Sequence, residues 1–110
     1  TAEQLVEILD HDASTVLLAK DGDTIVGSMT LIVFQIPTGI RAWIEDVVVD
    51  EQARGKGVGE ALNQRAMEIA MKAGAKTIDL TSRPSREAAN RLYQRLGFKA
   101  RDTNIYRYEA

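Results

Sequence analysis

The chain has 110 residues, of which 45% are hydrophobic, with a net charge of −2 and no cysteine. This size and composition predict one globular domain over residues 1–110. The near-balanced charge argues against nucleic acid as a partner, and the lack of cysteine excludes disulfides, thiolate zinc sites and cysteine nucleophiles. No apolar run approaches the roughly 20 residues that span a bilayer. We therefore expect a cytoplasmic protein that binds no membrane.

The first half of the chain predicts one helix followed by an antiparallel meander of three strands. Leu5, Ile8 and Leu9 lie at helical spacing. The turn signals Asp21–Asp23 and Pro37–Gly39 separate the apolar runs that follow. We expect a helix over Ala2–Asp10 and strands over Val16–Ala19, Thr24–Gln35 and Ala42–Val49.

The second half predicts two helices and two further strands. A stripe at three-four spacing marks the first helix, and it consists of Val58, Ala61, Leu62, Ala66, Ile69, Ala70 and Ala73. Gly74 ends this helix, and Thr77–Thr81 forms the next strand. The second helix begins at Pro84-Ser85 with Glu87 in its first turn, ends at Gly97 and buries Ala88, Ala89, Leu92 and Leu96. Phe98–Tyr108 closes the chain as a strand, which gives an α/β fold on a mixed sheet.

A glycine-rich segment, Gln52–Gly59 (QARGKGVG), lies between a predicted strand and a predicted helix. Free N–H groups and the dipole at a helix N-terminus favour an anion there. Two familiar phosphate motifs fail on spacing, because Lys56 precedes glycine instead of Ser or Thr and Glu60 takes the third glycine position of the dinucleotide fingerprint. A turn that only starts a helix needs fewer glycines and no cations, so the segment predicts a phosphate site.

Two motifs resemble those of the GNAT superfamily of N-acetyltransferases. Asp50–Leu62 (DEQARGKGVGEAL) resembles its acyl-CoA binding motif, with R-x-x-G-x-G at Arg54, Gly57 and Gly59. Ala89–Phe98 (ANRLYQRLGF) resembles its second motif. The resemblance implies a mixed, mostly antiparallel twisted sheet with helices on both faces. By this resemblance, we expect the family's N-terminal strand and helix to be missing from this chain.

The resemblance also implies acetyl-CoA as cosubstrate, without a metal. The CoA pyrophosphate would bind at Arg54, Gly55, Lys56, Gly57, Val58 and Gly59, and the pantetheine arm would pair with Val47, Val48 and Val49. The arm would enter a gap where the strands Trp43–Val49 and Thr77–Thr81 splay apart. The family often has a cofactor-binding Asn seven residues before its Tyr. That position is Arg86 here, with Asn90 one turn further on, and which of the two reaches CoA stays open.

Three residues are candidate proton carriers. Alternation along the strand IEDVVV predicts Trp43, Glu45, Val47 and Val49 on one face and Ile44, Asp46 and Val48 on the other. Carboxylates in such a strand are costly unless they are paired, solvated or used. The tripeptide Ile-Glu-Asp also occurs in amino-sugar and polyamine members of the family, so we expect a partly buried Glu45 to be the base, with Asp46 as the alternative. The motif match favours Tyr93 as a general acid. The other interpretation is that Tyr93 is an aromatic residue of the core. His11 is expected at the surface.

The expected function is transfer of an acetyl group from acetyl-CoA to a primary amine by direct attack in a ternary complex. A CoA-binding module without catalysis is the alternative. The acceptor would be a small-molecule amine, a peptide N-terminus or a lysine, and nothing in the sequence identifies it. Because many relatives dimerise through their C-terminal strands, the resemblance also suggests a homodimer.

Overall fold

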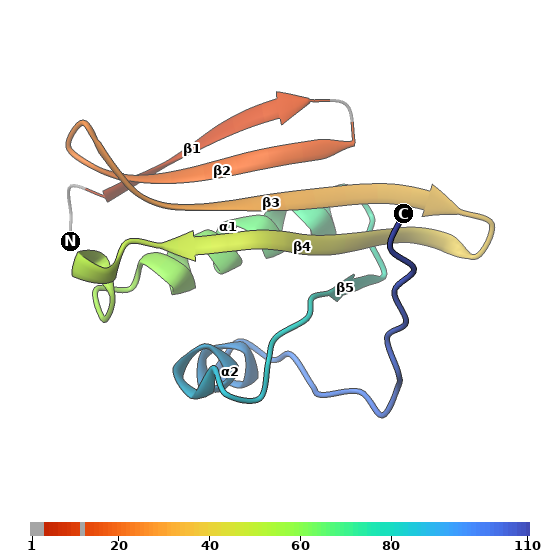
Figure 1. Cartoon of the computed structure of the whole chain (residues 1–110). Helices are drawn as coiled ribbons and strands as arrows, with labels where there is room; N and C mark the ends of the chain where they lie inside the picture. Colours follow the sequence, from red (N-terminus) through yellow and green to blue (C-terminus); the bar gives the residue numbers. More distant parts are fainter. Residues whose placement is uncertain (1–3, 12) are drawn as a thin grey trace.

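The computed structural model describes residues 4–11 and 13–110. Its strands are β1 (Gln4–His11), β2 (Ser14–Asp21), β3 (Thr24–Ile36), β4 (Gly39–Val49) and β5 (Thr77–Asp79). A short 3-10 helix, η1 (Glu51–Ala53), precedes α1 (Val58–Lys72), and α2 (Glu87–Arg95) follows β5. The sheet order is β1-β2-β3-β4-β5, and only the β4–β5 pair is parallel (Figure 1). This confirms the mixed, mostly antiparallel sheet.

The first element differs from the prediction, because β1 stands where a helix was expected over Ala2–Asp10. β1 pairs antiparallel with β2 along its whole length. The apolar pairs Leu5-Val6 and Ile8-Leu9 fit helical spacing, but over so short a segment they fit an extended run equally well. Pairing with β2 satisfies the backbone groups and decides between the two. Residues 1–3 and the side chain of His11 lie outside the described part of the chain.

The core lies between one face of the sheet and α1. The sheet contributes Leu17, Met29, Leu31 and Ile44, and α1 contributes Val58, Leu62, Ala66 and Ala70. The predicted stripe of α1 is confirmed except at Ala73, which is exposed, and Gly74 ends the helix with φ +91°. One polar side chain, Asn63, is fully buried on α1.

Gly27 in β3 sets how closely α1 approaches the sheet. A Cβ atom built at Gly27 would lie 2.7 Å from Cγ1 of Val58 and 3.2 Å from Cδ1 of Leu62. Real Cβ atoms do not approach other carbons this closely, so the first turns of α1 rest where β3 has no side chain. The glycine thereby positions the start of the helix.

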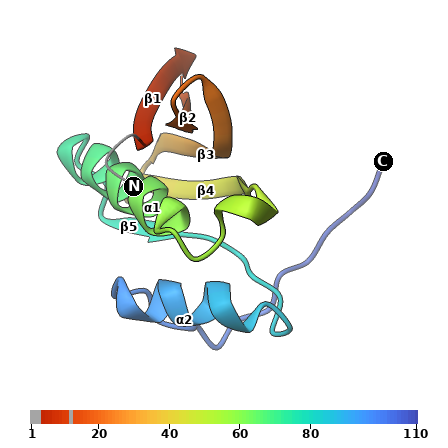
Figure 2. The ribbon, with the colours of Figure 1, turned by 90° about the vertical axis from the view of Figure 1, so that its left-hand side faces the viewer.

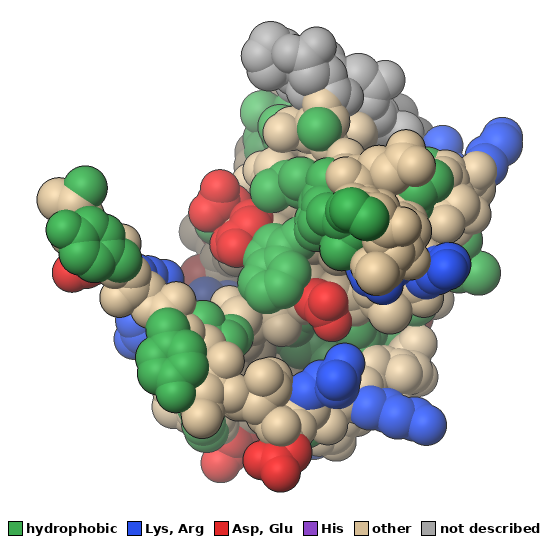
Figure 3. Space-filling view, turned by 90° about the vertical axis from the view of Figure 1, so that its right-hand side faces the viewer, with side chains coloured by type: hydrophobic (Ala, Val, Ile, Leu, Met, Phe, Trp, Pro, Cys, Tyr) green, Lys and Arg blue, Asp and Glu red, His purple; other side chains and the backbone are tan. Residues whose placement is uncertain are grey.

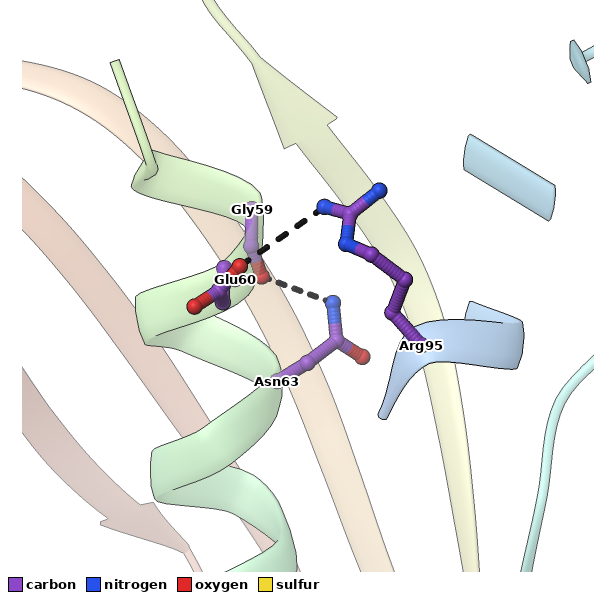
Figure 4. Close-up of polar contacts among 4 residues, drawn as sticks. All are labelled: Gly59, Glu60, Asn63 and Arg95. Atoms are coloured by element: carbon purple, nitrogen blue, oxygen red, sulfur yellow. Dashed lines mark hydrogen bonds and ion pairs between the residues drawn. The ribbon is translucent and has the colours of Figure 1, made fainter. Parts of the chain in front are cut away.

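α2 lies beside the first turns of α1, on the side of β4 away from β3 (Figures 1 and 2). Arg95 Nη2 lies 3.7 Å from Glu60 Oε1 across the two helices (Figure 4). The predicted buried face of α2 is wrong at Ala88, which is exposed, and it omitted Tyr93, the buried residue of this helix. A short helix with neighbours along a narrow strip buries less of its surface than the apolar pattern suggests.

The strand predicted over Phe98–Tyr108 is absent. Phe98 packs against the core, but the residues after it form no strand, and Ile105, Tyr106 and Tyr108 are exposed. Figures 2 and 3 show this segment leaving the body of the molecule. Its composition suits a strand, but a strand also needs a partner, and no described strand pairs with it. Among the described helices, none has the length and apolarity to cross a membrane.

Candidate acyl-CoA site

β4 and β5 separate at one end of the sheet. Their parallel pairing joins Arg41 to Thr77, Ala42 to Ile78 and Trp43 to Asp79, and it goes no further. β4 continues to Val49 with β3 on its other side. The edge of β4 that faced β5 therefore offers unpaired backbone N–H and C=O groups beyond Trp43. The splay expected between these two strands is present.

A β-bulge at Asp46 changes which side chains of β4 share a face. Thr30 pairs with Glu45 and Ser28 with Val48, so Met29 lies opposite two residues of β4. Asp46 has φ +54°, a left-handed conformation that is uncommon outside glycine.

The bulge makes the predicted alternation wrong. Ala42 and Ile44 face the core before it, and Val47 and Val49 pack against the same core after it. Val48 is 60% exposed, on the outer face. One extra residue interrupts strict alternation, because every side chain beyond the bulge lies on the opposite face from the one predicted.

Glu45 and Asp46 are both exposed, so the expectation of a partly buried Glu45 is wrong. The indole Nε1–H of Trp43 donates a hydrogen bond to Oε1 of Glu45. This contact orients the Glu45 carboxylate on the outer face of β4, next to the point where β5 diverges. A solvated, oriented carboxylate can still accept a proton from an approaching ammonium group.

The glycine loop lies just past the end of β4 and is a candidate cradle for an anion. Gly55 and Gly57 both have φ +81°, and a Cβ atom at either would meet no atom within 4 Å. The first hydrogen bond of α1 runs from the Ala61 N–H to the Gly57 carbonyl over 3.0 Å. The N–H groups of residues 58–60 therefore have no helical acceptor and face the loop end.

Two cations flank this cradle. Arg54 and Lys56 are exposed, and no ion pair within the described residues involves either. The loop itself is fixed at its start, because the Asp50 carboxylate accepts a hydrogen bond from the Gln52 N–H at 3.1 Å. Open space, free N–H groups and unpaired cations together fit a pyrophosphate.

Gly59 has a different role from Gly55 and Gly57. It lies within α1, and a Cβ atom there would be 3.3 Å from Cδ2 of Leu92 on α2. Its carbonyl accepts a hydrogen bond of 2.8 Å from Nδ2 of Asn63 (Figure 4). The third glycine of the motif therefore lets the two helices pack closely.

Tyr93 is buried in the packed interior, as the core interpretation predicts, and its role as a general acid stays a prediction. Its ring is only 6% exposed and packs edge-on against Phe98, with ring centroids 5.9 Å apart. Its hydroxyl has no hydrogen-bond partner in the described chain, and the hydroxyl oxygen is not fully buried. The ring belongs to the packed interior, while the hydroxyl is free to donate. Within the described residues, no hydrogen bond joins Tyr93 to Glu45 or Asp46, which belong to β4.

Asn90 and Arg86, the two candidates for a cofactor contact on α2, differ in what they already bind. Nδ2 of Asn90 donates to the Arg83 carbonyl at 3.0 Å. The side chain of Arg86, the N-cap residue of α2, is exposed and makes no hydrogen bond or ion pair within the described residues. Asn90 therefore holds the loop before α2, and Arg86 is available to a ligand.

Sequence reasoning missed two residues that shape this site. Gly27 positions the start of α1, and a glycine inside a predicted strand is a known sign of close backbone approach. Asn63 lies on the buried face of α1 but was not part of the predicted stripe, because a polar side chain gives no sign of burial in the sequence. In the part of the chain that the structure describes, no cluster of His, Cys, Asp and Glu could hold a metal ion.

The chain is similar to known proteins in sequence and in fold. Residues 1–98 match the model of the acetyltransferase (GNAT) family. N-alpha-acetyltransferase 30 of Schizosaccharomyces pombe is 34% identical over 71 residues, which cover 64% of this chain and 47% of that protein. Glucosamine 6-phosphate N-acetyltransferase of Trypanosoma brucei brucei is 40% identical over 84 residues, which cover 74% of this chain and 55% of that protein.

A solved structure, described as a transcriptional regulator from Bacillus halodurans, superimposes with a TM-score of 0.80. It is 32% identical, and the match covers 91% of this chain and 69% of that one. The chain spans about half the length of the two sequence relatives. By the family match, the splayed strands and the glycine loop, this chain belongs to the GNAT family of acetyltransferases.

Proposed function

We propose that this chain transfers an acetyl group from acetyl-CoA to a primary amine, by direct attack within a ternary complex. The observation that carries the proposal is the anion cradle of Gly55 and Gly57 beside the unpaired edge of β4. The two sequence relatives are both named N-acetyltransferases, which supports the same reaction class. Acetyl-CoA supplies the activated acetyl group.

The chain's own groups would bind the donor at two places. Free N–H groups at the start of α1, with Arg54 and Lys56 beside them, suit the pyrophosphate. The unpaired edge of β4 at residues 47–49 suits the amide groups of the pantetheine arm, which would add to the sheet as a strand does.

Two proton movements remain for the protein's side chains. Glu45 is the better candidate to take the proton from the attacking ammonium, because Trp43 orients its carboxylate where β4 and β5 diverge. Asp46, at the bulge, is the alternative base. Tyr93 is the candidate to donate a proton to the departing thiolate through its free hydroxyl.

The acceptor class is a primary amine on a small molecule or at a peptide terminus or lysine. We further propose that the protein forms a homodimer through its exposed C-terminal segment, residues 99–110. The cytoplasmic location stays a prediction.

Calorimetry with acetyl-CoA tests the donor site, using two glycines as a matched pair. Gly57 and Gly22 both have left-handed φ and open space at the Cβ position. Alanine at either costs about 1–2 kcal/mol of stability, but only Gly57→Ala places a methyl group in the cradle. We expect at least tenfold weaker binding for Gly57→Ala and unchanged binding for Gly22→Ala. Equal affinities for both variants would remove the basis of the proposal.

A turnover assay distinguishes an enzyme from a CoA-binding module without catalysis. Free-thiol release with acetyl-CoA and a broad panel of amines is expected for the enzyme. Tight binding of acetyl-CoA without turnover on any amine would favour the module instead.

A further inference from the structure

A second basic site lies before α2, away from the glycine loop along the chain. Thr81, Ser82, Arg83, Pro84 and Arg86 line a hollow of about 450 Å³, which we call the basic hollow. Its two charged lining residues are both arginines, and both are exposed. Within the described chain, no acidic side chain forms an ion pair with Arg83 or Arg86.

The backbone that carries the two arginines is held in place by α2. The Arg83 carbonyl accepts hydrogen bonds from the Arg86 N–H and from Nδ2 of Asn90, each at 3.0 Å. The arginines therefore project from a fixed turn, which reduces the ordering cost of binding a ligand between them.

A buried hydroxyl in the lining lacks a partner. Oγ of Ser82 has no accessible surface and no hydrogen bond in the described structure. An unsatisfied buried polar group costs about 1–3 kcal/mol. Because Ser82 lines the hollow, rotation of its side chain would let a ligand oxygen supply the missing acceptor.

The N-terminus of α2 adds partial positive charge beside the two arginines. Its first helical hydrogen bond runs from the Asn90 N–H to the Arg86 carbonyl at 2.9 Å, so the N–H groups of residues 87–89 have no helical acceptor. Glu87 is the opposing charge in this turn. Two guanidinium groups outweigh it, and arginine matches a phosphate group by bidentate hydrogen bonding.

We propose that the basic hollow binds a phosphate monoester through Arg83 and Arg86. The inference rests on the proposed function for the origin of this group. One source is the 3′-phosphate of CoA, and the other is a phosphorylated amine acceptor. Both offer a terminal dianionic phosphate, and the experiment distinguishes them.

The test compares wild type with Arg83→Gln, Arg86→Gln and the double variant. Arg91→Gln is the matched control, because Arg91 is an exposed arginine of α2 outside the hollow. In one arm, calorimetry measures Kd for CoA and for 3′-dephospho-CoA. In the other, it measures Kd for O-phosphoethanolamine and for ethanolamine, with and without CoA.

Wild type is expected to prefer the phosphorylated ligand about tenfold or more in one arm. The double variant should lose that preference and Arg91→Gln should keep it. Loss in the first arm assigns the hollow to CoA, and loss in the second assigns it to the acceptor. No preference in either arm, or a preference that the double variant keeps, overturns the inference. Failure of CoA and dephospho-CoA alike to bind folded wild type would instead overturn the proposed function, and the second arm would still test the hollow.

Discussion

Tyr93 is a residue whose ring and hydroxyl do different things. The ring is buried against Phe98, and the hydroxyl binds nothing in the described chain. Tyr93→Phe should therefore leave thermal stability almost unchanged. If the hydroxyl protonates the leaving thiolate, kcat should fall by roughly 10²–10⁴-fold, with Kd for acetyl-CoA retained. Thermal melts, calorimetry and thiol release measure the three quantities. Full activity in a stable Phe variant would make Tyr93 a packing residue only.

Glu45 and Asp46 can be separated through the pH dependence of turnover. An alkylammonium acceptor has a pKa far above 7, so a base matters most at low pH, where little neutral amine exists. We expect Glu45→Gln to lower kcat/KM strongly near pH 6 and less near pH 10. Asp46→Asn is the matched variant and should show a smaller effect that does not depend on pH. The reverse pattern would make Asp46 the base, and a constant ratio for both variants would mean that neither carboxylate accepts the proton.

Asn63 is a buried polar residue that lowers the stability of the core. Its Nδ2 binds the Gly59 carbonyl, but its buried Oδ1 has no donor. Asn63→Leu keeps the branched shape of the side chain and removes the unsatisfied acceptor, so we expect the free energy of unfolding to rise by about 1 kcal/mol. Urea denaturation measures it. A loss of stability would mean that an enclosed water satisfies Oδ1 or that the larger leucine overpacks the core.

At the scale of elements, the contact between β3 and α1 determines where the glycine loop lies. Gly27→Ala would force a Cβ atom against Val58, so unfolding should become about 1–3 kcal/mol easier. The Val58→Ala background removes the Cγ1 atom that the new methyl group meets. In that background Gly27→Ala should cost clearly less. Equal costs in both backgrounds would show that strain in β3, and not the helix contact, is responsible.

Patterns of neighbouring residues in the sequence could predict the turns, the main helix and the helix ends. Turn residues marked the β2–β3 and β3–β4 hairpins, spacing marked α1, and Gly74 and Gly97 marked the ends of both helices. The faces of β4 could not be predicted, because the bulge at Asp46 depends on pairing with β3 and leaves no pattern in the strand itself. The glycine and cation pattern predicted the candidate anion cradle, whose binding of an anion stays a prediction. The helix contact made by Gly59 did not, since it depends on where α2 packs.

At the scale of the whole molecule, the two ends of the chain show how secondary structure depends on partners. Residues 4–11 became a strand because β2 offered an edge. Residues 98–110 have strand-like composition but remain irregular, because no edge in the described chain pairs with them. Among the described strands, β5 is the last of the sheet, with β4 on one side and no strand on the other. An unpaired edge and an unpaired β-prone segment thus occur in the same molecule.

A second copy of the chain could pair with both the open edge of β5 and the C-terminal segment. Tyr106 and Tyr108 are 89% and 94% exposed, which is a large apolar surface to leave in water. We expect sedimentation equilibrium to show a homodimer that dissociates when Ile105 and Tyr106 are both replaced by Asn. The body of the protein should keep its melting transition at high concentration of the variant, because the core of β2, β3, β4 and α1 contains none of these residues. Lys99→Gln and Arg101→Gln together are the control, since they change the same segment but remove no apolar surface. A monomeric wild type at 100 μM would contradict the dimer, and the C-terminal segment would then be free for the acceptor or another partner.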